Sequence, residues 1–235
     1  MPVPVITQLR PRRSEKWTEV VPEEGEPILL PAGTVPNWWE AGFEVPLEEW
    51  QRTERMSRFH LMYDRACRLL TRREHFAREL ERKLAQRSRE MDLVDEVIRL
   101  CRERGFLDDE RAAQQITEQL MARGSIGAPK LQQELLRRGC DRQLAQRMVS
   151  EHCSGVDSFS AAMELLEGKR RTYEGKLEQY RRRTGNTGDR RVEMEIRGKL
   201  SASMMGFLAG RGFGDSEARQ AVREFCSRLM DSDED

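Results

Sequence analysis

The feature of this chain that most constrains its fold is an internal repeat at helical spacing. At three places a leucine is followed three residues later by an arginine and eleven residues after that by an aliphatic residue. The three sets are Leu84, Arg87 and Ile98, then Leu135, Arg138 and Val149, then Leu208, Arg211 and Val222. Leu80, Leu131 and Met204 stand four residues before the three leucines, one turn back on the same helix face. Because a further helical segment precedes each set, the repetition predicts three tandem units of three short helices.

The composition agrees with stacked thin helices. Of the 235 residues 37% are hydrophobic and 35% charged, which suits repeats that bury one stripe and leave the other face in water. The formal net charge is zero, but residues 15–54 carry ten acidic side chains against Lys16 and Arg52, whereas residues 65–90 carry nine basic against four acidic. A neutral total therefore does not exclude a polyanionic partner.

The cellular location is indicated by what the sequence lacks. No apolar run approaches the ~20 residues that cross a bilayer, and no basic stretch at the amino terminus leads into an apolar segment. The five cysteines form no CxxC pair, so reduced, buried thiols are expected. We expect a cytoplasmic protein, monomeric and without a membrane partner.

The first fifty residues differ in composition from the rest, because they are rich in proline and contain all four tryptophans. Residues 3–9, 17–21 and 27–30 are predicted as short strands, with residues 23–26 as the turn joining the last two. The sequence thus predicts a small β-rich module and linker over residues 1–57, followed by an elongated, curved, mainly α body.

Helix boundaries in that body follow from capping residues. Helix starts are predicted at Asp92, Asp108, Asp141 and Asp215, and helix stops at Gly105, Gly139 and Gly212. The predicted helices run near 48–73, 76–87, 92–104, 108–123, 128–138, 141–153, 158–183, 190–211 and 215–230. They divide into repeats at 58–105, 106–156 and 157–230, with a loop insertion near 184–189 and an acidic tail at 231–235.

No catalytic, cofactor or metal site is predicted. His60, His75 and His152 stand far apart with no cysteine or carboxylate at metal-ligand spacing, so they are interpreted as packing or surface residues. The glycine-rich stretch 210–214 resembles a phosphate loop only superficially, because it follows a helix instead of a strand. An enzyme with an unrecognised site has only scattered carboxylates and histidines to support it.

Two basic clusters are the candidate sites for a partner or DNA. One consists of Arg72, Arg73, Arg82, Lys83 and Arg87, and the other of Lys169, Arg170, Arg171, Arg181, Arg182 and Arg183. A solvated helix face is an equally good explanation, because glutamates intersperse both clusters.

The spacing of the repeat and the residues at several of its positions resemble those of the bacterial RecX family of RecA regulators. The matching stretches are Arg72–His75, Glu79–Leu80 and Lys83–Leu84, then Gly105–Arg111, then Gly127–Leu131 with Glu134–Leu135 and Arg138–Gly139. Arg211–Phe213 recurs in the third repeat. The strand-rich leader is also similar to one that many members carry. The chain departs from the family at Ala112, where an aromatic residue is usual, and at Phe76, where a serine or threonine cap is usual.

The resemblance implies a non-enzymatic regulator that binds RecA and its filament on single-stranded DNA, limits filament growth and lowers ATPase and strand-exchange activity. It implies no cofactor. The alternative is a helical module that binds DNA directly and independently of RecA, which the two basic clusters support.

Overall fold

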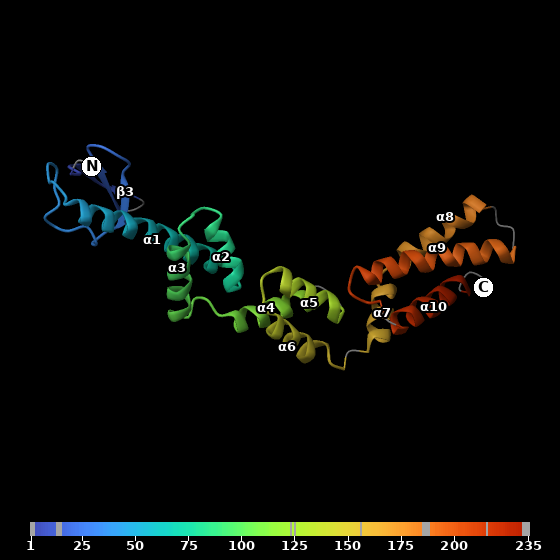
Figure 1. Cartoon of the computed structure of the whole chain (residues 1–235). Helices are drawn as coiled ribbons and strands as arrows, with labels where there is room; N and C mark the ends of the chain where they lie inside the picture. The colour runs from blue at the N-terminus through green and yellow to red at the C-terminus, as the bar shows by residue number, and fades with distance from the viewer. Residues whose placement is uncertain are drawn as a thin grey trace. The chain divides into compact units, whose positions relative to one another are not determined.

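The computed structural model describes residues 3–12, 16–122, 124, 126–155, 157–184, 189–214 and 216–231 (Figure 1). Within these ranges a three-stranded antiparallel sheet is followed by ten helices, so the predicted class, mainly α with a small strand-rich leader, is confirmed. The chain forms two compact units, residues 1–108 and 109–235.

The leader is an ordered module built on the sheet β1 (Ile6–Arg12), β2 (Trp17–Pro22) and β3 (Ile28–Pro31). Ile6, Val20 and Leu30 point into its core and are fully buried. The first strand lies later than the predicted 3–9, because its pairing with β2 runs on to the hairpin end, where Arg12 faces Trp17. The last turn before β3 contains Gly25 at φ 104°, as a tight turn requires.

The module is fastened to the helical part of the first unit by the long helix α1 (Leu47–Arg72). Trp39 stacks on Trp50 of this helix with ring centroids 6.5 Å apart. The Ser57 hydroxyl donates to the carbonyl of Leu29 at 2.8 Å and accepts from its amide at 3.1 Å. Because α1 runs without a break through residues 57 and 58, the sheet and the first helices share one element, and the domain boundary at that point stays a prediction.

The first repeat is completed by α2 (Ala77–Ala85) and α3 (Met91–Glu103), which pack on the second half of α1. Their shared core contains the predicted stripe residues Leu80, Leu84 and Ile98, all buried. The second unit holds α4 (Asp109–Ala122), α5 (Ala128–Arg137) and α6 (Arg142–Cys153), with Leu131 and Leu135 fully buried. The repeat therefore marks the buried face in both units.

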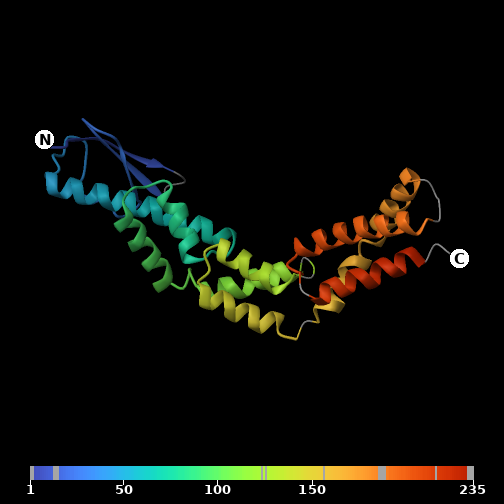
Figure 2. The same cartoon turned by 45° about the vertical axis from the view of Figure 1, so that its right-hand side comes forward.

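The third predicted repeat contains four helices where three were expected. They are α7 (Ser158–Glu167), α8 (Arg170–Thr184), α9 (Arg190–Ala209) and α10 (Ser216–Asp231). The prediction of one helix over 158–183 was wrong, because the chain turns at Gly168 and Lys169, whose amides bond to Glu164 and Leu166 at the end of α7. Glycine is a poor helix former, which makes the break inexpensive. α9 and α10 lie side by side in both views (Figures 1 and 2).

The predicted helix ends are largely confirmed. Gly105, Gly139 and Gly212 close helices at φ 69°, 97° and 89°, and the Asp141 carboxylate accepts from the amide of Gln143 at 2.8 Å. Asp92, by contrast, lies inside the first turn of α3 and pairs with Arg55. Asp215, the loop residues 185–188 and the tail residues 232–235 lie outside the described residues.

The cysteines agree with the sequence prediction. All five are unpaired, and Cys101, Cys140 and Cys226 are buried while Cys67 and Cys153 are half-buried. Burial raises the pKa of Cys101 to about 11 and that of Cys140 to about 12. These two thiols are therefore protonated at neutral pH and pack as small apolar side chains.

Candidate partner-binding surfaces

The first basic cluster lies in the first unit, where α1 turns into α2. Arg72 ends α1, Arg73 follows it, Arg82 and Lys83 lie on α2, and Arg87 follows that helix. The structure divides the five side chains into two groups. Arg73 and Lys83 form ion pairs with a buried carboxylate, whereas the side chains of the other three form none with the described residues.

Arg73 and Lys83 are held by the carboxylate of Glu79, whose side chain is only 6% exposed. Both terminal nitrogens of Arg73 donate to this carboxylate, and Lys83 Nζ lies 3.1 Å from Glu79 Oε1. Lys83 Nζ also lies 2.9 Å from His75 Nε2, and His75 Nδ1 lies 2.9 Å from the carbonyl oxygen of Arg73. The four side chains form a half-buried network that joins the end of α1 to α2.

The pKa shifts of Glu79 and His75 agree with this network. Burial by itself raises the pKa of Glu79, but the hydrogen bonds from Arg73 and Lys83 outweigh it and hold the pKa below its ordinary value. Burial lowers the pKa of His75. A neutral His75 can donate from Nδ1 to the Arg73 carbonyl and accept at Nε2 from Lys83, so the expectation of a packing histidine is met at this position.

The side chains of Arg72, Arg82 and Arg87 are exposed and form no hydrogen bond or ion pair with the described residues. Arg87 also lines a surface groove of about 260 Å³ beside α1. The described residues that line it are Arg58, Leu61, Met62, Arg65, Leu84, Arg87, Ser88 and Glu90. The groove thus combines an apolar floor with arginines.

Two of the groove's arginines were not predicted from the sequence. Arg58 pairs with Glu90 at 3.0 Å, and Arg65 has a buried Nε without a hydrogen-bond partner among the described residues. Arg58 and Arg65 are seven residues apart on α1 and so share one helix face, with Leu61 and Met62 between them. The seven-residue spacing of the two arginines could have been recognised in the sequence. Only the packing of α2 against α1, however, shows that this face of α1 remains open to solvent.

The second basic cluster lies in the second unit, along α8. Lys169 and Arg171 are exposed and make no side-chain ion pair with the described residues. Arg170 is half-buried. Its guanidinium donates twice to the Glu167 carboxylate at 2.8 Å and lies 5.3 Å from the centre of the Phe225 ring. Arg170 therefore helps to fix the turn between α7 and α8 against α10.

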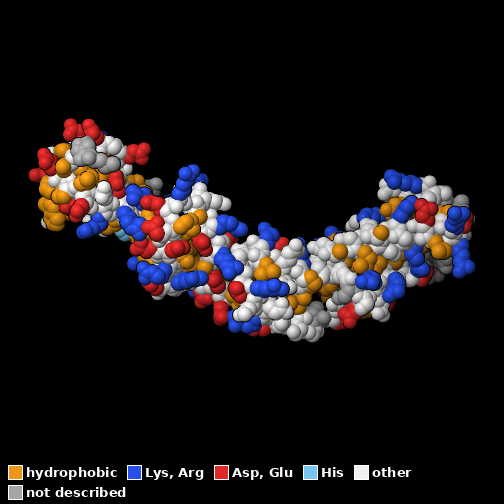
Figure 3. Space-filling model, in the orientation of Figure 1, with side chains coloured by type: hydrophobic (Ala, Val, Ile, Leu, Met, Phe, Trp, Pro, Cys, Tyr) orange, Lys and Arg blue, Asp and Glu red, His pale blue; other side chains and the backbone are white. Residues whose placement is uncertain are grey.

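The three consecutive arginines at the end of α8 point in different directions, as their helical spacing requires. Arg181 is half-buried and lies 3.6 Å from Glu193 of α9. Arg182 is exposed and lies 3.3 Å from Glu178 on its own helix, while Arg183 is exposed and forms no ion pair with the described residues. On the face drawn in Figure 3, basic side chains crowd the end of the α8–α9 hairpin.

The described residues hold no group of three or more His, Cys, Asp or Glu side chains that could bind a metal ion. None of the helices within the described ranges is long and apolar enough to cross a membrane.

The chain is similar to proteins that are already known. No protein-family model matches the chain. Regulatory protein RecX of Trichlorobacter lovleyi is 31% identical over 159 residues, which cover 67% of this chain and 91% of that protein. The chain belongs to the RecX family. Regulatory protein RecX of Halorhodospira halophila is 42% identical over 104 residues, covering 44% of this chain and 63% of that protein.

A solved RecX structure shares the fold. The crystal structure of a regulatory protein RecX superposes with a TM-score of 0.51, covering 94% of this chain and 100% of that chain at 14% identity. At this identity the likeness concerns the fold alone. The similarity to the Trichlorobacter lovleyi protein confirms the family predicted from the sequence, and the protein is a RecX-type regulator.

Proposed function

We propose that this RecX protein binds RecA and RecA filaments on single-stranded DNA, and that it limits filament extension, ATP hydrolysis and recombinase and coprotease activity. It acts by binding and not by catalysis. The observation that carries the proposal is the relationship to regulatory protein RecX, which extends over 91% of that relative.

The charge on the described surfaces supports a binding role. Three arginines of the first unit and two basic residues at the start of α8 have no ion-pair partner among the described residues. These residues are Arg72, Arg82, Arg87, Lys169 and Arg171. Because their charges are not neutralised within the described parts of the chain, they are available to acidic side chains or phosphates of a filament.

The repeats suit a partner that is itself repetitive. We propose that residues 58–105, 106–156 and 157–230 act as successive binding units, so that one regulator touches more than one RecA protomer. Each additional contact is then intramolecular, which raises the apparent affinity without a larger single interface.

The decisive experiment measures RecA-dependent ATP hydrolysis on single-stranded DNA with a bacterial RecA. Substoichiometric amounts of the folded regulator should slow hydrolysis, because a protein that limits filament extension acts on many protomers at once. The Arg72→Ala, Arg82→Ala, Arg87→Ala triple variant should inhibit less than the wild type. Unchanged hydrolysis at equimolar wild-type regulator contradicts the proposal.

A further inference from the structure

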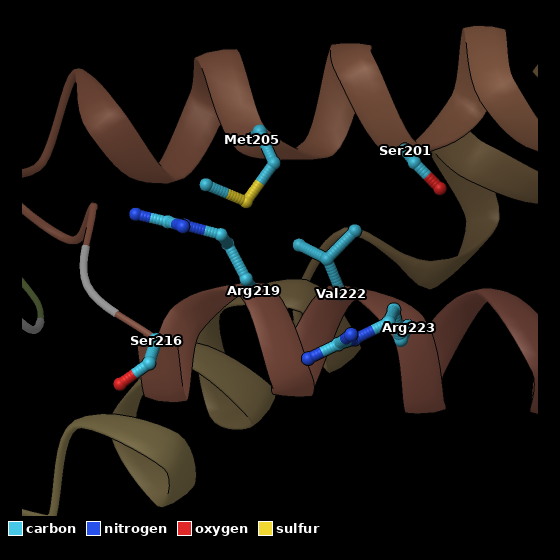
Figure 4. A pocket seen from close by; sticks show the side chains of 6 residues that line it. All are labelled: Ser201, Met205, Ser216, Arg219, Val222 and Arg223. Atoms are coloured by element: carbon cyan, nitrogen blue, oxygen red, sulfur yellow. The ribbon is translucent and has the colours of Figure 1, made fainter.

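A cleft of about 350 Å³ opens between α9 and α10, outside both basic clusters. Ser201 and Met205 line it from α9, and Ser216, Arg219, Val222 and Arg223 line it from α10. In Figure 4 the Arg219 side chain extends beside Met205, while the Arg223 side chain runs below Val222. The cleft therefore combines an apolar floor with two guanidinium groups and two hydroxyls.

The positive charge of this cleft is not neutralised by its walls, because its described lining contains no carboxylate. Arg219 Nη2 donates to the carbonyl oxygen of Gly214 at 3.3 Å, and the Arg223 side chain makes no hydrogen bond or ion pair with the described residues. Arg228, farther along the same helix, is bound to the carboxylate of Glu224. The charges of the two cleft arginines are therefore not neutralised by a carboxylate of the described lining and are available to a ligand.

The repeat shows that the scaffold does not require two arginines here. When Val222 is aligned with Ile98 and Val149, the positions of Arg219 and Arg223 correspond to Asp95 and Arg99 in the first repeat. They correspond to Gln146 and Ser150 in the second. Like charges one turn apart on a helix repel each other, and an anion bound beside both arginines would relieve this repulsion.

We propose that this cleft binds the sugar–phosphate backbone of single-stranded nucleic acid. Arginine and serine side chains are among the groups that contact phosphate oxygens, and all polar side chains in the lining can donate. Arg219 and Arg223 lie one helical turn apart, so they can engage neighbouring phosphates, while Met205 and Val222 offer an apolar surface to the sugar. The inference deepens the proposed function and rests on it, since it gives the regulator its own contact with the strand inside a RecA filament.

The test uses the full-length protein without RecA. Binding to a fluorescent oligothymidylate is measured by anisotropy across a series of salt concentrations. The Arg219→Ala, Arg223→Ala variant should bind more weakly, and its slope of log affinity against log salt should be shallower by about 1.4, since each phosphate neutralised on a single strand contributes about 0.7. The Arg219→Lys, Arg223→Lys variant keeps the charge and should retain most of the slope.

A charge-matched control is Arg197→Ala, Arg228→Ala, which removes two arginines of α9 and α10 that do not line the cleft. It should leave the slope close to that of the wild type. Equal decreases in both double variants would mean that only total charge matters and would overturn the assignment. So would an unchanged slope in the cleft variant, or a wild-type protein that does not bind the oligonucleotide at low salt.

RecA inhibition is measured separately for each variant. Should the cleft variant bind DNA normally but fail to inhibit RecA, the occupant is an acidic protein surface and the nucleic-acid assignment is wrong. Should the wild type bind the oligonucleotide through this cleft but leave RecA unaffected, the proposed function fails while the cleft assignment stands.

Discussion

Gly127 and Gly212 meet backbone to backbone. The Gly127 amide donates to the carbonyl of Arg211 at 2.8 Å, and a Cβ atom on Gly127 would lie 2.3 Å from the carbonyl oxygen of Gly212. A Cβ atom on Gly212 would lie 2.5 Å from Lys130 Cβ. The loop before α5 is therefore joined to the turn after α9 through a contact that excludes side chains, and this contact ties the second repeat to the third within the second unit.

Replacing Gly127 by alanine should destabilise the second unit by about 1–3 kcal/mol, the cost of forcing a methyl group into a filled site. Its φ of −75° suits alanine, so the effect is steric and not conformational. Thermal or urea unfolding followed by circular dichroism measures it. Gly198→Ala is the matched control, because its added methyl meets open space within α9, and it should stabilise the protein by about 0.5–1 kcal/mol. Equal effects of the two changes would contradict the close contact.

The network around Glu79 predicts a decrease of stability in acid. The pKa values of His75 and Glu79 both lie below their ordinary values, so the unfolded chain binds more protons than the folded one as the pH falls. Stability should decline first below about pH 6.5, where unfolded histidine titrates, and again below about pH 4.3, where unfolded glutamate titrates. Urea unfolding as a function of pH measures both steps.

Glu79→Gln separates the two contributions. It leaves Arg73 and Lys83 without their carboxylate and should cost about 2 kcal/mol at neutral pH, the usual worth of hydrogen bonds to a charged group. It should also flatten the decline below about pH 4.3. Glu81→Gln, two residues along α2 and without a partner among the described residues, should change neither. A pH profile that Glu79→Gln leaves unaltered would show that the network does not govern acid stability.

The tryptophans of the leader should respond differently to substitution. Trp39 is 3% exposed and stacked on Trp50, whereas Trp38 is 62% exposed. Trp39→Phe should therefore lower stability by about 1–2 kcal/mol and Trp38→Phe should leave it nearly unchanged. Acrylamide quenching provides a second measurement, since Trp38→Phe should remove most of the quenchable emission. Full exposure of all four indoles to acrylamide would contradict an ordered module.

Sequence reasoning succeeded where the controlling interactions are local. The left-handed glycines at 105, 139 and 212 and the Asp141 cap follow from backbone geometry that a few neighbouring residues determine. The repeat of buried leucines likewise follows from helical periodicity. The caps Asp157 and Asp189 carry the same signal and were missed, although each accepts from the amide two residues on.

The sequence does not show which polar side chains remain available to a partner, because tertiary packing determines this. Nothing in the local sequence shows that Glu79 is buried and holds Arg73 and Lys83, whereas Arg72 and Arg82 are exposed. Arg58 and Arg65 of the α1 groove and the two arginines of the α9–α10 cleft were missed for the same reason, because such hollows exist only once two helices have packed. A cluster of basic residues in a sequence is therefore a poor guide to the cations that remain free.

The arginine run 181–183 combines paired and unpaired side chains. Arg181 lies 3.6 Å from Glu193 and Arg182 lies 3.3 Å from Glu178, whereas Arg183 forms no ion pair with the described residues. Exposed pairs of this kind contribute little to stability. The triple alanine variant should consequently keep its melting temperature within a few degrees and weaken binding to the RecA filament. Its salt slope should be shallower by about 0.7 for each phosphate of the single strand that the variant no longer neutralises.

Single variants locate the effect. Arg183→Ala should reproduce most of the decrease in affinity, and Arg181→Ala, whose side chain is half-buried against α9, should affect mainly the melting temperature. Filament binding is followed from low to physiological salt with the folded fraction of each variant held equal. A specific contact with an acidic RecA surface gives a decrease in affinity with little change in slope, because no phosphate counterions are released. If instead the melting temperature of the triple variant falls while affinity and slope are unchanged, the run serves the α8–α9 hairpin and not the partner.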